Sequence, residues 1–138
     1  MDIRNSEKAY IYRRDKKKCF YCEEKLKYRQ ITLDHYLPKS RGGTEVIYNL
    51  VLCCEDCNRL KGNKTPSNYK ELIIRLFKKA VLDGMIKGEN LKISSRELQK
   101  ELLKVNKIED IRDIFVFQSN TMRFYIDKNK VIKIIHLG

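Results

Sequence analysis

The sequence lacks the features of an exported or membrane-embedded protein. No apolar run approaches the roughly 20 residues that a membrane-spanning helix needs. The first five residues carry charge where a signal peptide would need an apolar core. The chain also has no internal repeat and no low-complexity tract. We therefore expect a cytoplasmic protein with no membrane association.

Acidic side chains are few for the number of basic ones. The 138 residues contain 30 Lys and Arg against 18 Asp and Glu, which gives a formal net charge of +12 at pH 7. Such an excess favours a polyanionic partner, most often nucleic acid, although a basic solvated surface produces it too. Because 42% of the residues are hydrophobic, the chain is not a disordered basic tail. Its length fits one modest domain, or a small core with an appended lobe.

Patterning along the chain predicts an α+β fold. The first half is predicted to contain a basic helix at 5–17, a hairpin of strands 31–36 and 46–52, and a short helix from Glu55 to about Lys61. The second half is predicted to contain a helix that ends near Gly84, a helix after a capping box at residues 94–97, and a small antiparallel β-meander of strands 114–118, 122–127 and 131–136. The chemistry lies in the first half, so we expect a division into residues 1–66 and a C-terminal lobe, residues 67–138, of unassigned role.

Two Cys-x-x-Cys pairs, Cys19 with Cys22 and Cys54 with Cys57, predict a structural zinc site. Zn²⁺ takes four soft ligands in a tetrahedron, and each pair offers two thiolates from one local turn. In a reducing compartment, metal binding is favoured over disulfides. The alternatives are unrelated buried cysteines or a redox pair, although no thioredoxin-like alternation of strands and helices is present. Cys53 could replace Cys54, but the two-residue spacing favours Cys54 and leaves Cys53 as a core thiol.

A further set of motifs lies around these pairs in a fixed order. They are Leu33-Asp-His-x-x-Pro38, Gly42-Gly43, Asn49-Leu50, and Cys54-x-x-Cys-Asn-x-x-Lys-Gly62. In this order they resemble the HNH endonuclease family, over roughly residues 10–64. The resemblance implies a ββα-metal core, here joined to a four-cysteine zinc site, that hydrolyses phosphodiester bonds of DNA with one divalent ion. Residues 1–66 would then be the nuclease core.

The resemblance also implies roles for four side chains. His35 would be the general base, and Asp34 and Asn58 would hold the catalytic ion. Asn49 would brace the hairpin loop and orient His35. The three family positions here read His-Asn-Asn, and Glu23 stands where relatives often have glycine.

The chemistry of these residues agrees with that assignment. A neutral imidazole can take a proton from water near neutral pH, and oxygen ligands suit Mg²⁺ or Mn²⁺. A lone strand histidine is more often a partly buried polar residue, but the motif around His35 favours catalysis. Because neighbouring strand residues point to opposite faces, Asp34 and His35 can share a site only where the strand twists or ends. Lys39, Arg41 and Lys61 are expected to contact phosphates.

The sequence leaves other functions open. The alternative to a nuclease is a non-catalytic zinc-containing module that binds DNA or RNA, and a third class is a protein-interaction zinc module, which the net charge disfavours. RNA is not excluded as the substrate. One active site cuts one strand, so double-strand cleavage would require a homodimer or two sequential encounters. The basic run at residues 13–18 either contacts DNA or forms a solvated face. His136 has no partner motif and is expected to be structural.

Overall fold

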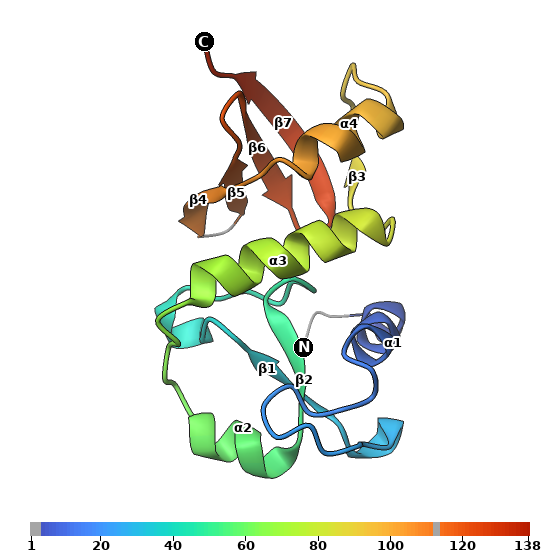
Figure 1. Ribbon diagram of the computed structural model, residues 1–138, viewed down its shortest axis with the longest axis vertical. Coiled ribbons are helices and arrows are strands. Elements are labelled where there is room, and N and C mark those ends of the chain that lie inside the picture. The colour runs from blue at the N-terminus through green and yellow to red at the C-terminus, as the bar shows by residue number, and fades with distance from the viewer. Residues whose placement is uncertain (1–3, 112–113) are drawn as a thin grey trace. The chain divides into compact units, whose positions relative to one another are not determined.

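A computed structural model describes residues 4–111 and 114–138 of the chain (Figure 1). The chain divides into two compact units, Met1–Ser67 and Asn68–Gly138. Each unit combines helices with strands, so the predicted α+β class is confirmed. None of the helices within these described ranges has both the length and the apolar character needed to cross a membrane.

The first unit has the predicted strand–strand–helix order. Its elements are α1 (Asn5–Arg14), η1 (Tyr28–Gln30), β1 (Thr32–His35), η2 (Lys39–Arg41), β2 (Leu50–Cys53) and α2 (Glu55–Lys61). Strands β1 and β2 pair antiparallel, with Thr32 opposite Cys53 and His35 opposite Leu50. Helix α2 follows β2 directly and ends, as predicted, at Gly62, whose N–H bonds to the carbonyl of Asn58.

Strand β2 is shorter than predicted, because residues 46–49 form a turn. The cause is the side chain of Asn49, which is fully buried. Its Oδ1 accepts a hydrogen bond from the N–H of Leu37 at 2.9 Å, and its Nδ2 donates to the carbonyls of Leu37 and Thr44, both at 3.1 Å. These bonds take the place of ladder bonds and close the loop between the strands.

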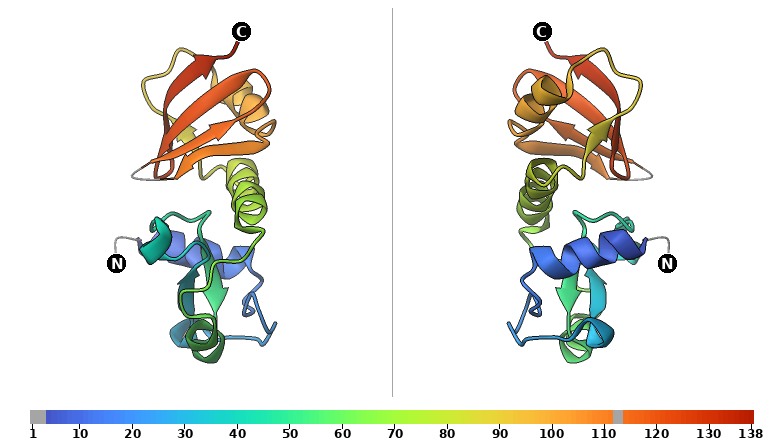
Figure 2. Two further views of the ribbon diagram at one scale, coloured as in Figure 1. Left: turned by 90° about the vertical axis from the view of Figure 1, so that its left-hand side faces the viewer. Right: turned by 90° about the vertical axis from the view of Figure 1, so that its right-hand side faces the viewer.

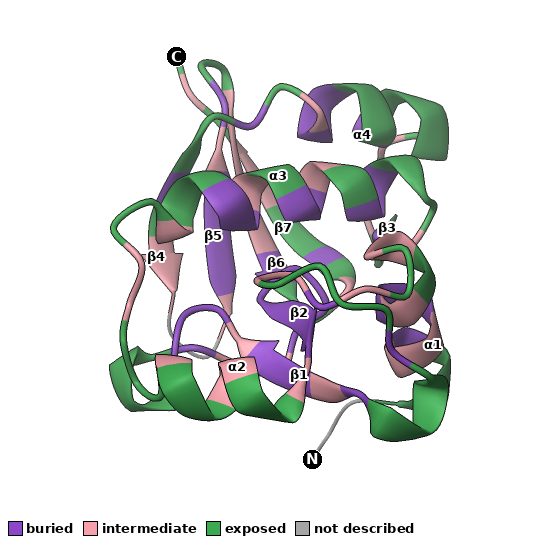
Figure 3. Ribbon diagram, turned by 60° about the horizontal axis from the view of Figure 1, so that its bottom comes forward, coloured by how far each residue is buried: buried purple, intermediate pink, exposed green. Residues whose placement is uncertain are grey.

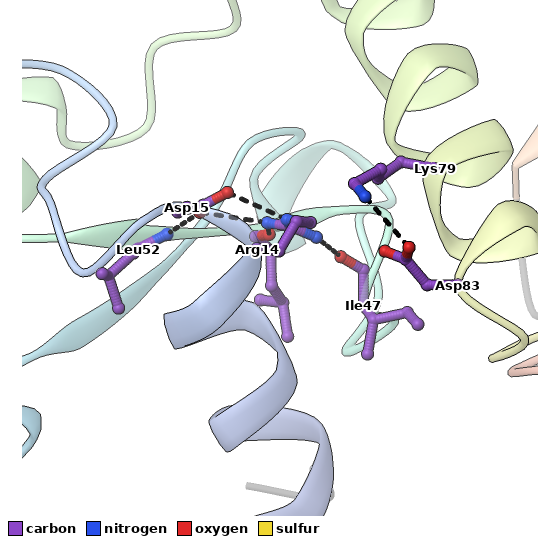
Figure 4. A network of polar contacts seen from close by, with 7 residues as sticks. Arg14, Asp15, Ile47, Leu52, Lys79 and Asp83 are labelled. Atoms are coloured by element: carbon purple, nitrogen blue, oxygen red, sulfur yellow. Dashed lines mark hydrogen bonds and ion pairs between the residues drawn. The ribbon is translucent and has the colours of Figure 1, made fainter.

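Helix α1 is also shorter than predicted and ends in a network that ties it to β2 (Figure 4). The side chain of Arg14 is 3% exposed, pairs with Asp15 at 2.9 Å, and donates to the carbonyls of Ile47 and Leu50 at 2.7 and 2.6 Å. Asp15 in turn accepts from the N–H of Leu52 at 2.8 Å. Arg14 and Asp15, which lie within the basic run at residues 13–18, therefore have structural roles, and their side chains are almost completely buried.

The second unit contains a larger sheet than predicted. Its elements are α3 (Tyr69–Leu82), β3 (Lys87–Gly88), α4 (Ser95–Leu102), β4 (Lys107–Ile111), β5 (Phe115–Gln118), β6 (Met122–Asp127) and β7 (Lys130–His136). The strand order is β3-β7-β6-β5-β4, and all neighbours are antiparallel except β3 and β7 (Figure 2). The predicted meander is the β5–β7 part of this sheet. Strand β4 escapes the sequence pattern because three of its five residues are charged.

Each unit has its own buried core (Figure 3). In the second unit, one face of α3 is buried, and it is the face that the helical periodicity predicts: Leu72, Ile73, Leu76, Phe77, Ala80 and Val81. The ring of Phe77 stacks on Phe117 of β5 with centroids 4.1 Å apart. In the first unit, all four residues of β2 are buried. This strand therefore anchors the β1–β2 hairpin, which carries Asp34 and His35, in the core.

Candidate active site and metal centre

Four thiols meet where the first cysteine pair approaches α2. The Sγ atoms of Cys19, Cys22, Cys54 and Cys57 all lie within 4.8 Å of one another. The Sγ atoms of Cys22 and Cys54 are 3.9 Å apart. A tetrahedral zinc site with Zn–S bonds of about 2.3 Å places its sulfur atoms about 3.8 Å from one another. The dimensions of the cluster therefore fit zinc.

Local backbone geometry brings these thiols together. Cys54 is the N-cap residue of α2, and its Sγ accepts from the N–H of Cys57 at 3.4 Å. At the other pair, the N–H of Glu23 bonds to the carbonyl of Cys19 at 3.0 Å, and Glu23 has a left-handed φ of 62°. Glycine adopts that conformation without strain, so the backbone at Glu23 favours the glycine that the family resemblance leads one to expect there.

The thiols have unequal acidities in the absence of a metal. Burial raises the pKa of Cys19, but backbone hydrogen bonds, first from Cys22, outweigh burial and lower the pKa to about 6. The hydrogen bond with Cys54 raises the pKa of Cys57 to about 12. Four thiolates this close together need a divalent cation, which the zinc interpretation supplies. Cys53 lies outside the cluster: it is buried, it donates to the carbonyl of Cys54 at 3.2 Å, and burial raises the pKa of its thiol.

Asp34, on β1, is a buried carboxylate held by a phenol and an ammonium group. It is 5% exposed. The hydroxyl of Tyr21 donates to its Oδ2, and the Nζ of Lys61 lies 3.1 Å from Oδ2 and 3.4 Å from Oδ1. Burial, followed by the hydrogen bond to Asp34, raises the pKa of Tyr21, so the phenol stays protonated and can donate. Lys61 also donates to the carbonyl of His35 at 3.1 Å.

His35, the last residue of β1, contacts the loop that follows the strand. Its Nε2 lies 2.7 Å from Oε1 of Glu45, and the same oxygen lies 2.6 Å from Nζ of Lys39. Burial raises the pKa of Glu45, but the hydrogen bonds from Lys39 and His35 outweigh burial and hold the pKa below its usual range. In the part of the chain that the structure describes, no hydrogen bond joins the side chains of Asp34 and His35, as the alternation of strand residues predicts.

The remaining predicted site residues lie on α2 and in the loop. Asn58 is one turn before Lys61, and its Nδ2 donates to Oγ1 of Thr32 at 3.3 Å. Thr32 and Asp34 share one face of β1, so Asn58 and Lys61 lie along that face in the same order. Among the described residues, no hydrogen bond joins Asn58 to Asp34. Arg41, at the end of η2, is exposed.

Comparison with known proteins bears on what this arrangement does. The HNH endonuclease family model matches residues 19–72, which include both cysteine pairs, β1, β2 and α2. Residues 19–72 are therefore similar to the HNH endonuclease family, and we call them the HNH segment.

Among solved structures, the chain is similar to the crystal structure of the Type II-C Cas9 enzyme from Actinomyces naeslundii. The two are 24% identical, with a TM-score of 0.41, over 70% of this chain and 12% of that one. The chain therefore spans a small part of that enzyme's length. No curated protein matches the chain.

Two side chains of the HNH segment escaped sequence reasoning. Tyr21 lies between Cys19 and Cys22, where an aromatic residue suggests packing around the pair of cysteines. Its bond to Asp34 depends on the fold and leaves no sequence signal. Glu45 is the one acidic residue in a basic loop, which is a weak signal that could have drawn attention to it.

The oxygen ligands expected in the HNH segment suit a divalent ion. The carboxylate of Asp34 is buried and needs a cation beside it, a need that the ammonium of Lys61 meets in this structure. The amide of Asn58 lies against the same face of β1, and the bond from its Nδ2 to Thr32 leaves Oδ1 available. A carboxylate with an amide oxygen is a donor set for Mg²⁺ or Mn²⁺ rather than for zinc.

Proposed function

We propose that the chain is a metal-dependent HNH endonuclease that hydrolyses phosphodiester bonds of DNA. The observation that carries the proposal is on β1. Two consecutive residues of this strand carry the groups that the reaction needs. Asp34 is a buried carboxylate paired with the ammonium of Lys61, and His35 is bonded to the carboxylate of Glu45. A hydrolase that attacks a phosphodiester needs a base for the water and a positive charge for the phosphate.

His35 is the proposed general base. Its ring is 19% exposed, so water can reach it, and Glu45 engages Nε2, which leaves Nδ1 to take the proton of the attacking water. Asn49 supports this geometry indirectly, because its three hydrogen bonds fix the loop that carries Glu45.

Asp34 and Asn58 are the proposed ligands of the divalent ion, Mg²⁺ or Mn²⁺. When bound, the ion supplies positive charge that stabilises the developing charge on the phosphate and the leaving oxygen. Lys61 now neutralises Asp34, and in the loaded enzyme its ammonium becomes free to bind a substrate phosphate. Tyr21 holds the carboxylate of Asp34 in place through its hydroxyl.

Binding of the DNA backbone is assigned to the basic side chains around this site. Lys39 keeps 62% of its side chain exposed although its ammonium contacts Glu45, and Arg41 is exposed. Both can meet phosphates beside His35. The four thiols hold a structural zinc ion that fixes α2, and with it Asn58 and Lys61, against the hairpin.

Nicking of supercoiled plasmid DNA by the zinc-loaded protein tests this function. With Mg²⁺ or Mn²⁺ we expect nicking, and His35→Ala should lower its rate about 100-fold or more, which is a typical contribution of a general base. His136→Ala is the matched control, because His136 is exposed on β7 outside the HNH segment, and it should keep the parent rate. A parent that binds plasmid without nicking it would favour the non-catalytic nucleic-acid-binding module. If His35→Ala nicks at the parent rate, His35 is not the general base.

A further inference from the structure

We propose that Glu45 is a positioning residue for His35, whose ring it holds in the tautomer that carries its proton on Nε2. The inference rests on the proposed function, in which His35 is the base, and assigns a role to a residue outside the family's three named positions. Glu45 touches neither the phosphate nor the ion in this account. It acts through His35.

The hydrogen-bonding capacity of the two side chains leads to this assignment. A carboxylate can only accept, so the 2.7 Å contact between Oε1 of Glu45 and Nε2 of His35 makes Nε2 the donor. A neutral imidazole carries one ring proton, and with that proton on Nε2 the other nitrogen, Nδ1, has a free lone pair. The contact therefore prepares His35 to accept a proton from water at Nδ1.

The surroundings of Glu45 keep its carboxylate ionised and directed at His35. Its side chain is 13% exposed, so water competes little for the bond. Lys39 contacts the same Oε1 at 2.6 Å and supplies a positive charge that favours the ionised form. Oε2 is buried and has no hydrogen-bond partner among the described residues, so no second donor draws the carboxylate away from the ring.

The loop beneath Glu45 is fixed by hydrogen bonds on the residues before it. The carbonyl of the preceding residue, Thr44, accepts from Asn49 at 3.1 Å, and the N–H of Gly43 bonds to the carbonyl of Pro38 at 3.0 Å. The orientation of the carboxylate is therefore set before substrate arrives, which is what a positioning group requires.

The consequence for the reaction is twofold. The other tautomer would present an N–H to the attacking water and could not accept its proton. When Nδ1 does take that proton, the ring becomes positively charged beside the carboxylate, which stabilises it. Loss of Glu45 should therefore lower kcat and leave KM for DNA close to the parent value.

Nitrogen NMR of the zinc-loaded chain of 138 residues, with ¹⁵N-labelled histidine, tests the inference directly. The chain has two histidines, so a His136→Gln variant assigns both rings. At a pH at which the rings are neutral, we expect His35 of the parent to carry its proton on Nε2. Glu45→Leu should give a mixture of tautomers and a kcat about 10- to 100-fold below the parent with Mg²⁺. Glu45→Gln, whose amide oxygen still accepts a bond but carries no charge, should fall between the two.

Glu109→Leu is the matched control, because Glu109 is exposed on β4 and paired with Lys107. It should keep the parent tautomer and the parent kcat. A parent ring protonated on Nδ1, or a Glu45→Leu variant with the parent tautomer and kcat, would overturn the inference. If Glu45→Leu loses its zinc or its fold, the near-isosteric Glu45→Gln decides by the same two readouts. Failure of the proposed function shows separately, in a parent that does not cut or in His35→Ala cutting at the parent rate.

Discussion

At the scale of single residues, Asp34 and Lys61 form an ion pair whose side chains are only 6% and 9% exposed. Removal of one partner from such a pair leaves a buried charge without compensation, at a cost of about 3–5 kcal/mol. Lys61→Met should therefore lower the free energy of unfolding by an amount in that range, measured by urea denaturation. Lys64→Met removes an exposed lysine a few residues further along and should leave stability unchanged.

The same variant tests whether Asp34 holds a metal ion. With Lys61 absent, Mn²⁺ is the remaining cation that can neutralise the carboxylate, so it should raise the melting temperature of Lys61→Met more than that of the parent. Thermal melts with and without Mn²⁺ measure this difference. Equal shifts in Lys61→Met, Lys64→Met and the parent would speak against Asp34 as an ion ligand.

Two cysteine variants test the zinc site, because burial and metal binding predict opposite orders for their loss of stability. Cys22 is exposed and Cys53 is fully buried. If zinc is bound by the four clustered thiols, Cys22→Ser should lose the metal and much of the stability of the first unit, because metal binding and folding are coupled. Cys53→Ala should retain one zinc per chain and lose only packing energy, about 1 kcal/mol. Zinc content by atomic spectroscopy, with melting curves, checks both, and the reverse ranking would refute the four-cysteine zinc site.

At the scale of elements, the loop between β1 and β2 depends on a close backbone approach at Gly43. A Cβ at this position would overlap the carbonyl oxygen of Leu37 and lie 2.9 Å from Nδ2 of Asn49. Backbone cannot move aside as a flexible side chain can, so Gly43→Ala should cost about 3 kcal/mol or more. It should also disturb the contact between His35 and Glu45.

Gly42→Ala is the comparison for that prediction. Gly42 is exposed and has a left-handed φ of 97°, so an alanine there should cost the conformational strain of that backbone, about 1–2 kcal/mol. Urea denaturation of both variants measures the difference in the free energy of unfolding. If Gly43→Ala is no more destabilised than Gly42→Ala, the close approach does not hold the loop.

Sequence patterns anticipate the elements whose signals are local. Helix α2 was predictable in its start, its end at Gly62 and its position after the second cysteine pair, because a helix stop and a spacing motif both depend on neighbouring residues. The turn at residues 46–49 was not, because it depends on side-chain bonds from Asn49 to residues several positions away. Strands β3 and β4 were also missed. Their own sequence patterns are weak, and they are stabilised by pairing with distant strands, β3 with β7 and β4 with β5.

In the candidate site, too, residues that belong to local motifs could be predicted, and residues that only the fold brings together could not. Cysteine spacing predicted the cluster of four thiols, which the structure confirms, and the motif order singled out Asp34, His35 and Asn58, whose roles stay predictions. The contacts that Tyr21 and Glu45 make with Asp34 and His35 were not predictable, because both arise from the tertiary fold, although the single acidic residue of a basic loop marks Glu45 weakly.

At the scale of the whole molecule, the two units have separate cores, and among the described residues only the first contains a thiol cluster. Calorimetry of the full chain should therefore show two transitions. Removal of zinc with a strong chelator should lower the temperature of one transition and leave the other unchanged. A single transition that shifts as a whole would show instead that the units unfold together.

The central claim is that residues 19–72 form a hydrolytic site in which His35 activates water. The most direct measurement is the single-turnover rate of DNA strand cleavage by the zinc-loaded chain, with and without Mg²⁺, for the parent and for His35→Ala. We predict cleavage that requires the divalent ion and falls about 100-fold or more in His35→Ala, with DNA affinity unchanged. Cleavage that persists without Mg²⁺, or at the parent rate in His35→Ala, would contradict the account.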